Sequence, residues 1–267
     1  MIILVGTPIG NLADASPRVR ETLARATVLA VEATRVARKL LDGLGLTDAH
    51  PRFVVMHDHN ERSRTAELVE LARTEDVVVA TDAGMPTVSD PGYRLVAAAA
   101  TAGVPVTAVP GPTAVATALA VSGLPTDRFC FEGFPPRKAG DLRRRLAELV
   151  AEPRTLVFYE SPKRVVATLR TMAEVLGPRP AAVARELTKL HEEVRRGTLA
   201  ELADWDDPRG EIVIVIAGAE AAPAPFEPAV AEVRELIALG VRTRDACRHV
   251  AARTGLSANA LYGLVQG

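Results

Sequence analysis

Short runs of apolar residues alternate with longer amphipathic segments through the first half of the chain. Such runs are typical of buried parallel strands, whereas apolar residues three and four positions apart predict helices. The predicted strands cover residues 2–5, 28–31, 53–55, 77–80 and 104–109, and the predicted helices cover residues 17–25, 34–44, 62–74, 93–102 and 113–121. This alternation predicts an α/β domain with a largely parallel sheet.

The second half of the chain continues the alternation after a Ser-Gly-Leu-Pro break at residues 122–125. Strands are predicted at 128–132, 155–159, 181–185 and 211–217, and helices near 140–151, 162–176 and 198–203. A Pro/Ala-rich stretch at 221–228 predicts an extended tether, and a helix, a Gly255 turn and a helix capped by Ser257 follow in a helix-turn-helix cadence. We therefore predict an α/β domain at 1–117, a second α/β domain at 118–220, and a linker with a helical tail at 221–267.

Two loops that directly follow predicted strands are rich in Gly and Pro. One begins after the apolar run at residues 77–80 and reads Thr-Asp-Ala-Gly-Met-Pro, and the other follows residues 2–5 and reads Gly-Thr-Pro-Ile-Gly-Asn. Loops at the carboxyl ends of strands bind ligands in open α/β sheets. Neither loop has the spacing of a dinucleotide fingerprint or of a P-loop, which predicts a different kind of ligand cradle.

Ordered motifs along nearly the whole chain resemble the tetrapyrrole methylase superfamily, and within it the ribosomal RNA small-subunit methyltransferase I branch. The motifs occupy residues 5–12, 31–35, 39–41, 57–61, 81–86, 89–92, 109–114, 131–134, 159–164, 185–189 and 210–216. The resemblance implies two α/β domains of the class III methyltransferase type with a cofactor cleft between them, plus the small helical tail. One departure is Ala33, where the family usually has Asp.

The resemblance implies that S-adenosylmethionine binds in the cleft between the two domains. The implied cofactor-binding residues are Thr7, Pro8, Gly10, Asp82, Ala83, Gly84, Met85, Pro86, Val88, Ser89, Asp90, Thr113, Ala114, Leu187 and Thr188. Thr113 and Ala114 follow a Pro-Gly-Pro turn, where a helix N-terminus offers backbone N–H groups to the methionine carboxylate.

The branch resemblance implies methylation of a ribose 2′-hydroxyl on a cytidine in the decoding region of small-subunit (16S) ribosomal RNA. A hydroxyl is a poor nucleophile at neutral pH, so a base or a nearby positive charge should assist. The candidate catalytic residues are Glu32, Arg35, Glu160, Lys163 and Lys189, and Arg35 and Arg164 could also hold RNA phosphates. Salt bridges between the domains would explain the Glu32–Arg35 and Glu160–Arg164 pairs equally simply.

Basic clusters offer further candidates for RNA contact. Besides Arg35 and Arg164 we single out Arg143 and Arg144 on a predicted helix and Arg242 and Arg244 in the tail. Several such clusters beside one cleft would form a phosphate track, although an Arg run on a helix is more often simply a solvated face.

Residues 57–61, His-Asp-His-Asn-Glu, could be interpreted as a metal site. Two His at i and i+2 without a distant third ligand instead favour a hydrogen-bonding loop, and we predict no metal.

Composition and net charge restrict the class of protein to which the chain can belong. The 267 residues are 48% hydrophobic and 24% charged, with a net charge of −1, which excludes a dominant overall electrostatic attraction to nucleic acid. Two distant Cys fit a reduced cytoplasmic protein, and no apolar stretch is long enough to cross a membrane.

We expect a homodimer acting on 16S ribosomal RNA or an assembled small subunit. The alternatives are a methyltransferase of this fold acting on a tetrapyrrole or a protein side chain, and a non-catalytic RNA-binding relative.

Overall fold

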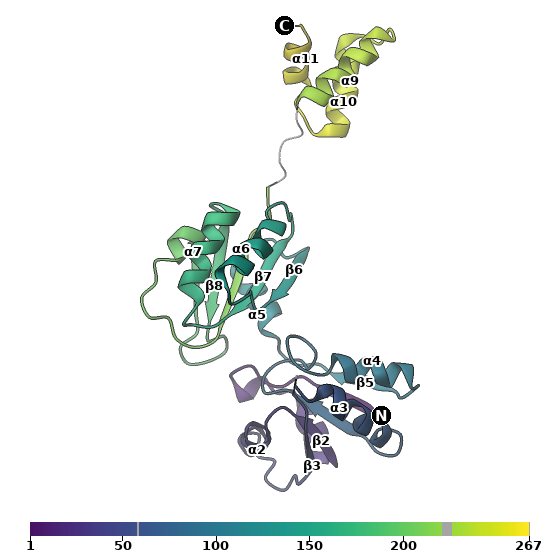
Figure 1. The fold of residues 1–267 in the computed structure, drawn as a ribbon, viewed down its shortest axis with the longest axis vertical. Helices are drawn as coiled ribbons and strands as arrows, with labels where there is room; N and C mark the ends of the chain where they lie inside the picture. The colour runs from purple at the N-terminus through teal and green to yellow at the C-terminus, as the bar shows by residue number, and fades with distance from the viewer. Residues whose placement is uncertain (58, 221–225, 267) are drawn as a thin grey trace. The chain divides into compact units, whose positions relative to one another are not determined.

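The computed structural model describes residues 1–57, 59–220 and 226–266. Contacts within the chain divide it into two compact units, Met1–Gly218 and Ala219–Gly267. The first unit contains two five-stranded sheets, and we call the parts built on them the first lobe and the second lobe (Figure 1). The predicted fold class, two α/β parts followed by a helical segment, is confirmed.

The first lobe has a wholly parallel sheet with strand order β3-β2-β4-β1-β5. Its strands are β1 (Ile2–Val5), β2 (Val28–Val31), β3 (Arg52–Val55), β4 (Val77–Ala80) and β5 (Val106–Val109), and its helices are α1 (Pro17–Arg25), α2 (Thr34–Gly43), α3 (Glu61–Leu71) and α4 (Tyr93–Thr101), with a short 3-10 turn η1 (Leu12–Asp14). These match the predicted elements closely.

Helices cover both faces of this sheet, which explains why its central strands are apolar without alternation. Val77 and Val79 pack on the side of α3 and α4, whereas Val78 and Ala80 pack on the side of α1 and α2. The order β4-β1 at the sheet centre brings the loops after β1 and β4 side by side at the carboxyl edge, where a ligand site is expected.

The second lobe has a mixed sheet with strand order β6-β7-β10-β8-β9, in which only β6 and β7 run parallel. Its strands are β6 (Phe129–Gly133), β7 (Thr155–Glu160), β8 (Pro180–Arg185), β9 (Glu193–Thr198) and β10 (Ile212–Ile216), and its helices are α5 (Ala114–Ser122), α6 (Ala139–Glu148), α7 (Val165–Leu176) and α8 (Leu199–Leu202). Helices α6, α7 and α8 cover one face, and α5 covers the other.

Helix α5 connects the lobes and packs on the second sheet. Val115, Ala118 and Leu119 contact apolar side chains of β7, β8 and β10. The domain boundary predicted at 117/118 therefore falls inside a helix whose apolar side belongs to the second lobe. The N-terminus of this helix lies at the edge of the first lobe, directly after the loop that follows β5.

The second unit is a small helical bundle with its own core. It consists of α9 (Phe226–Ala238), α10 (Thr243–Thr254) and α11 (Ala258–Gln266), which pack around Val233, Cys247, Val250 and Leu261. Of the tether predicted at 221–228, residues 221–225 lie outside the described residues, and 226–228 form the first turn of α9 instead. None of the helices in the described residues combines the length and apolarity needed to cross a membrane.

Candidate functional site

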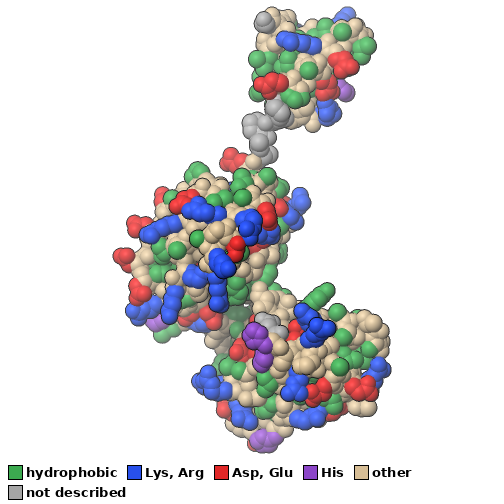
Figure 2. All heavy atoms as spheres, in the orientation of Figure 1, with side chains coloured by type: hydrophobic (Ala, Val, Ile, Leu, Met, Phe, Trp, Pro, Cys, Tyr) green, Lys and Arg blue, Asp and Glu red, His purple; other side chains and the backbone are tan. Residues whose placement is uncertain are grey.

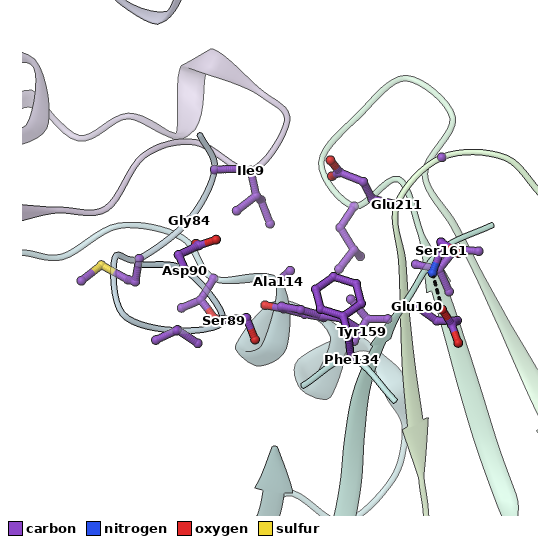
Figure 3. A pocket seen from close by; sticks show the side chains of 18 of the residues that line it. Ile9, Gly84, Ser89, Asp90, Ala114, Phe134, Tyr159, Glu160, Ser161 and Glu211 are labelled. Carbon is purple, nitrogen blue, oxygen red and sulfur yellow. Dashed lines mark hydrogen bonds between the residues drawn. The ribbon is translucent and has the colours of Figure 1, made fainter. Parts of the chain in front are cut away.

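A pocket of about 350 Å³ opens between the two lobes (Figure 3). It is bounded by the loop after β4, the N-terminus of α5, and loops at the ends of β6, β7, β8 and β10. The lining residues are Ile9, Ala83, Gly84, Met85, Val88, Ser89, Asp90, Thr113, Ala114, Phe134, Tyr159, Glu160, Ser161, Pro162, Leu187, Gly210, Glu211, Ile212 and Val213.

The loop after β4 is held against the loop after β1 by backbone hydrogen bonds. The Thr7 amide donates to the Gly84 carbonyl at 2.9 Å, and the Gly84 amide donates back to Thr7 at 3.2 Å. The buried Thr7 hydroxyl also donates to the Thr81 carbonyl at 3.2 Å. Gly84 has φ +86°, a conformation that costs other residues strain. Thr7 therefore positions the loop that lines the pocket and does not itself line it.

Backbone strain is concentrated in the two loops that face each other across the pocket. In the described part of the chain, four of the five non-glycine residues with positive φ lie there: Thr87 and Ser89 in the loop after β4, and Glu186 and Thr188 in the loop after β8. Such conformations cost about 1–3 kcal/mol each and persist where the surroundings enforce them, often at functional sites. Their clustering supports assigning the pocket a function.

The N-terminus of α5 presents its first backbone amides to the pocket. The Thr113 hydroxyl caps the helix by accepting from the Ala116 amide at 3.4 Å, and Thr113 and Ala114 both line the pocket. The preceding Pro-Gly-Pro turn is fixed by close approach of two glycines, since a Cβ on Gly111 would lie 2.2 Å from the Gly6 carbonyl oxygen. A helix N-terminus in this position favours an anionic group such as a carboxylate.

Most of the predicted cofactor-binding residues line this pocket. Those that do are Ala83, Gly84, Met85, Val88, Ser89, Asp90, Thr113, Ala114 and Leu187. Thr7, Pro8, Gly10, Asp82, Pro86 and Thr188 do not. Thr188 instead accepts a hydrogen bond from the Asn11 amide at 3.1 Å, joining the loop after β8 to the loop after β1.

Glu160, a predicted catalytic residue, reaches the pocket wall but is engaged within the second lobe. Its carboxylate accepts from the Ser161 amide at 2.8 Å and the Thr168 hydroxyl at 2.6 Å, and it pairs with Arg164 at 3.5 Å. The side chain is fully buried. Figure 3 shows the carboxylate beside Ser161 and turned away from Asp90 across the pocket. These contacts give Glu160 a structural role at the start of α7. Its ion pair with Arg164 lies within the second lobe and does not join the two lobes.

Lys189 is also committed to an ion-pair network. Its ammonium donates to Glu186 at 2.9 Å and to Glu211 at 3.0 Å. Burial works against the charged form, but these hydrogen bonds outweigh it and raise the pKa of Lys189 above its ordinary value. The same contact lowers the pKa of Glu186. Lys189 is therefore protonated at neutral pH and is unsuited to act as a base.

The remaining predicted catalytic residues lie outside the pocket lining. Glu32 accepts a hydrogen bond from the Asp82 amide at 3.1 Å and so supports the loop after β4. Arg35 is exposed on α2, and Lys163 is exposed in the loop after β7. Lys163 directly follows Ser161 and Pro162, which do line the pocket.

Several lining residues were not predicted from the sequence: Ile9, Phe134, Tyr159, Ser161, Pro162, Gly210, Glu211, Ile212 and Val213. Tyr159 is the most distinctive chemically. Burial raises the pKa of Tyr159 to about 12, and the negative charge of Asp90 adds to the shift. Its hydroxyl is therefore a neutral hydrogen-bond donor at physiological pH. A Tyr at the end of a predicted strand, within a motif already singled out, was the available signal.

The predicted RNA-binding arginines differ in how they are engaged. Arg143 pairs with Glu174, Arg144 pairs with Asp141, and Arg164 donates to the Pro136 carbonyl at 2.8 Å. Figure 2 shows acidic and basic side chains interspersed on the visible face of the second lobe. Exposed pairs of this kind are only weakly stabilising and leave little net charge for phosphate. Arg242 and Arg244 are at the start of α10 in the second unit.

The loop at residues 57–61 supports the start of a helix through Glu61. Asp58 lies outside the described residues, and no cluster of three potential metal ligands occurs among the others. The buried Glu61 carboxylate accepts from the Gly92 amide at 2.9 Å and the Arg94 amide at 3.0 Å. Glu61 thus caps the first turn of α4 and anchors the end of the loop after β4.

Replacing Glu61 with alanine is expected to lower the free energy of unfolding by about 1–2 kcal/mol, because the buried Gly92 amide and the partly buried Arg94 amide at the start of α4 lose their acceptor. Glu61→Gln, which keeps a carbonyl acceptor, should lose less than half of that. Urea unfolding of the three proteins measures the differences. Equal stability of Glu61→Ala and the parent would contradict the capping role.

The pocket suits the cofactor that the resemblance implies. Ile9, Leu187, Ile212 and Val213 contribute apolar side chains to the lining, while residues 83–85 and the first residues of α5 offer backbone polar groups. Sites of this composition hold a small molecule with both an apolar ring system and charged ends. The residues present therefore fit S-adenosylmethionine, and the first amides of α5 would hold its carboxylate.

Comparison with known proteins finds close relatives over the full chain. A family model of tetrapyrrole (corrin/porphyrin) methylases matches residues 1–203. The ribosomal RNA small subunit methyltransferase I of Mycobacterium tuberculosis is 49% identical over 269 residues, covering 99% of this chain and 94% of that protein. The protein of the same name from Mesorhizobium japonicum is 46% identical, covering 98% of this chain and 90% of that protein.

Solved structures with the same fold are more distant in sequence. A diphthine synthase has a TM-score of 0.61 at 14% identity, covering 81% of this chain and 89% of that one. A uroporphyrin-III C-methyl transferase from Thermus thermophilus, complexed with S-adenyl homocysteine, has a TM-score of 0.55 at 23% identity, covering 80% of this chain and 96% of that one. At these identities the likeness establishes the fold alone.

Proposed function

The chain belongs to the tetrapyrrole methylase family, in the ribosomal RNA small subunit methyltransferase I branch, and from this we propose that it methylates the 2′-hydroxyl of a cytidine in the decoding region of 16S ribosomal RNA, using S-adenosylmethionine. The observation that carries the proposal is the pocket between the lobes, which collects nine of the residues assigned to the cofactor from the motifs. The close relatives' shared name supplies the RNA substrate.

In this proposal the pocket between the lobes holds the two reactants together. Backbone amides at the α5 N-terminus and the strained loop after β4 would hold the cofactor, which supplies a methyl group on its sulfonium when bound. Loops of the second lobe would present the ribose hydroxyl from the opposite side. Fixing the oxygen behind the methyl group accounts for much of the acceleration that such a site can give.

We propose Asp90 as the group that accepts the proton of the ribose hydroxyl. Asp90 lines the pocket on the loop after β4, across from Tyr159 (Figure 3), and its negative charge contributes to the raised pKa of Tyr159. The neutral Tyr159 hydroxyl can donate a hydrogen bond to the acceptor ribose or to Asp90, which would fix their relative positions.

Ala33 does not favour the non-catalytic alternative. It occupies the N-cap position of α2 and makes no side-chain cap hydrogen bond, and the family's usual Asp would be a favourable cap at that position. The absence of a carboxylate at residue 33 is therefore expected to affect the stability of α2. Ala33→Asp is expected to raise the free energy of unfolding by about 1 kcal/mol, measured by urea unfolding, with methyl transfer unchanged. A large gain in activity at equal stability would instead indicate an acid role at this position.

We also propose a homodimer in the cytoplasm, as the superfamily resemblance implies, with Arg242 and Arg244 of the tail contacting RNA. The relatives match this chain over nearly its full length, so the tail beyond residue 203 is part of the aligned region. An assembled small subunit or free 16S RNA would be the partner.

An acceptor panel tests the proposed substrate. The protein is incubated with tritiated S-adenosylmethionine and, separately, undermethylated small subunits, free 16S RNA, and uroporphyrinogen. Label in the subunits or RNA is the expected result. Label in the tetrapyrrole would favour the alternative substrate, and label in none of them, despite cofactor binding, would favour the non-catalytic alternative.

A further inference from the structure

Phe134 is exposed although it lines the pocket. It follows β6 directly, and 61% of its surface is open to solvent. A register shift between Phe131 and Gly133, with Gly133 at φ +67°, ends the pairing of β6 with β7 just before it. Bulges of this kind commonly re-aim a side chain near a functional site. The chain thus exposes a large apolar ring at the pocket mouth.

The Phe134 ring packs against Tyr159, which in turn packs against Phe131. The Phe134 and Tyr159 ring centroids are 5.4 Å apart with the planes at 61°, and Tyr159 meets Phe131 at 4.9 Å and 67°. Aromatic residues make up only 4% of the sequence, and three of them gather here. Figure 3 shows Phe134 and Tyr159 together, across from Ser89 and Asp90. Edge-to-face contacts hold the ring in position while part of its surface stays available.

Exposed cations occur on the loop that carries Phe134 and on the neighbouring loop after β7. Arg137 and Lys138 follow Phe134 in the same loop, and Lys163 follows the lining residues Ser161 and Pro162; all three are exposed. The Arg164 guanidinium joins the two loops through its hydrogen bond to Pro136. Within the described residues none of the three exposed cations forms an ion pair, whereas the neighbouring residues 143–145 of α6 all do.

We propose that this surface is the acceptor-nucleotide subsite: Phe134 stacks on the base of the target nucleotide, and Arg137, Lys138 and Lys163 hold the adjacent phosphates. The inference rests on the proposed function and specifies how the RNA is held. An exposed ring with cations beside it matches an unstacked nucleotide, because aromatic stacking accepts any base face and cations neutralise the backbone. The stacked base would leave its ribose facing Asp90 and Tyr159.

Steady-state methyl transfer to small subunits tests the stacking role. Phe134→Ala is expected to raise the KM for subunits by about tenfold, with the Kd for S-adenosylmethionine unchanged, and Phe134→Trp should keep a KM close to the parent's. Phe129→Ala is the matched control, because Phe129 is 45% exposed at the other end of β6 and does not line the pocket. It should leave both constants unchanged.

Three results would overturn the assignment. If Phe134→Ala has the same KM for subunits as the parent, Phe134 does not stack on the target base. The proposed function would still stand in that case, because the parent protein is active. A raised cofactor Kd with the same subunit KM would make Phe134 a wall of the cofactor site. If the parent neither methylates nor binds RNA, the proposed function fails, and the subsite fails with it.

Salt dependence tests the cationic part separately. The affinity of the protein for subunits is measured against salt concentration, and Lys163→Gln with Arg137→Gln should lower the slope of log K against log salt by roughly 0.7 per lost phosphate contact. The control is Arg143→Gln, whose guanidinium pairs with Glu174. An equal slope for all proteins would contradict phosphate binding by this surface.

Discussion

Replacing Gly111 with alanine is expected to lower the rate of methyl transfer by about 100-fold and the free energy of unfolding by about 2–3 kcal/mol. The added Cβ would lie 2.2 Å from the Gly6 carbonyl oxygen and 2.5 Å from the Gly6 carbonyl carbon. Both are backbone atoms, so the contact cannot be relieved by a side-chain rotation. The turn before α5 must move, and the helix N-terminus that faces the cofactor moves with it.

Gly140→Ala provides the matched control, since a Cβ at this position in α6 meets nothing within 4 Å. It should be neutral or slightly stabilising, because alanine favours helix more than glycine does. Calorimetric binding of S-adenosylhomocysteine and urea unfolding measure the two effects. Wild-type cofactor affinity in a folded Gly111→Ala protein would show that the α5 N-terminus does not hold the cofactor.

Replacing Asp90 with asparagine is expected to lower kcat by about 100-fold or more, while the Kd for the cofactor and the KM for subunits change less than threefold. The substitution preserves the size of the side chain and removes its ability to accept a proton, and general bases contribute about 10²–10⁴ in rate. Single-turnover transfer of a tritiated methyl group measures the chemical step.

Tyr159→Phe separates the hydroxyl donor from the carboxylate. It retains the ring that supports Phe134 and loses only the group whose pKa is raised to about 12. A smaller loss than in Asp90→Asn, and little further loss in the double variant, would indicate that the two groups act together. An Asp90→Asn protein with the parent's kcat would remove Asp90 from catalysis and point to positioning alone as the source of the rate.

The amino-acid pattern was sufficient to predict the strands of the first lobe, because a sheet covered by helices on both faces needs uninterrupted apolar strands such as Val77–Ala80. Strand β9 was missed. It lies at the sheet edge and reads Glu-Val-Arg-Arg-Gly-Thr, so its polar residues give no apolar run or regular alternation. Its place depends on pairing with β8, which local sequence does not encode.

The sequence predicted those site residues that lie together in one loop after a clear strand. It did not predict the residues that the fold brings to the pocket from distant segments. Gly84 and Ser89 lie in a loop that follows a clear strand, and both line the pocket. Glu160 looked like a catalytic carboxylate, but Thr168, one helical turn into α7, accounts for part of its hydrogen bonding. Glu211 reaches the pocket only because β10 inserts between β7 and β8. That insertion is a property of the topology.

The most direct test of the proposed 2′-O-methylation is the identity of the methylated atom. Small subunits labelled by the protein with tritiated S-adenosylmethionine are digested to nucleosides and, in parallel, hydrolysed with alkali. We expect label in 2′-O-methylcytidine and in an alkali-resistant dinucleotide, since a methylated 2′-oxygen cannot attack the adjacent phosphate. Label in a base-methylated nucleoside, with complete alkaline cleavage at the labelled position, would contradict the proposed 2′-O-methylation.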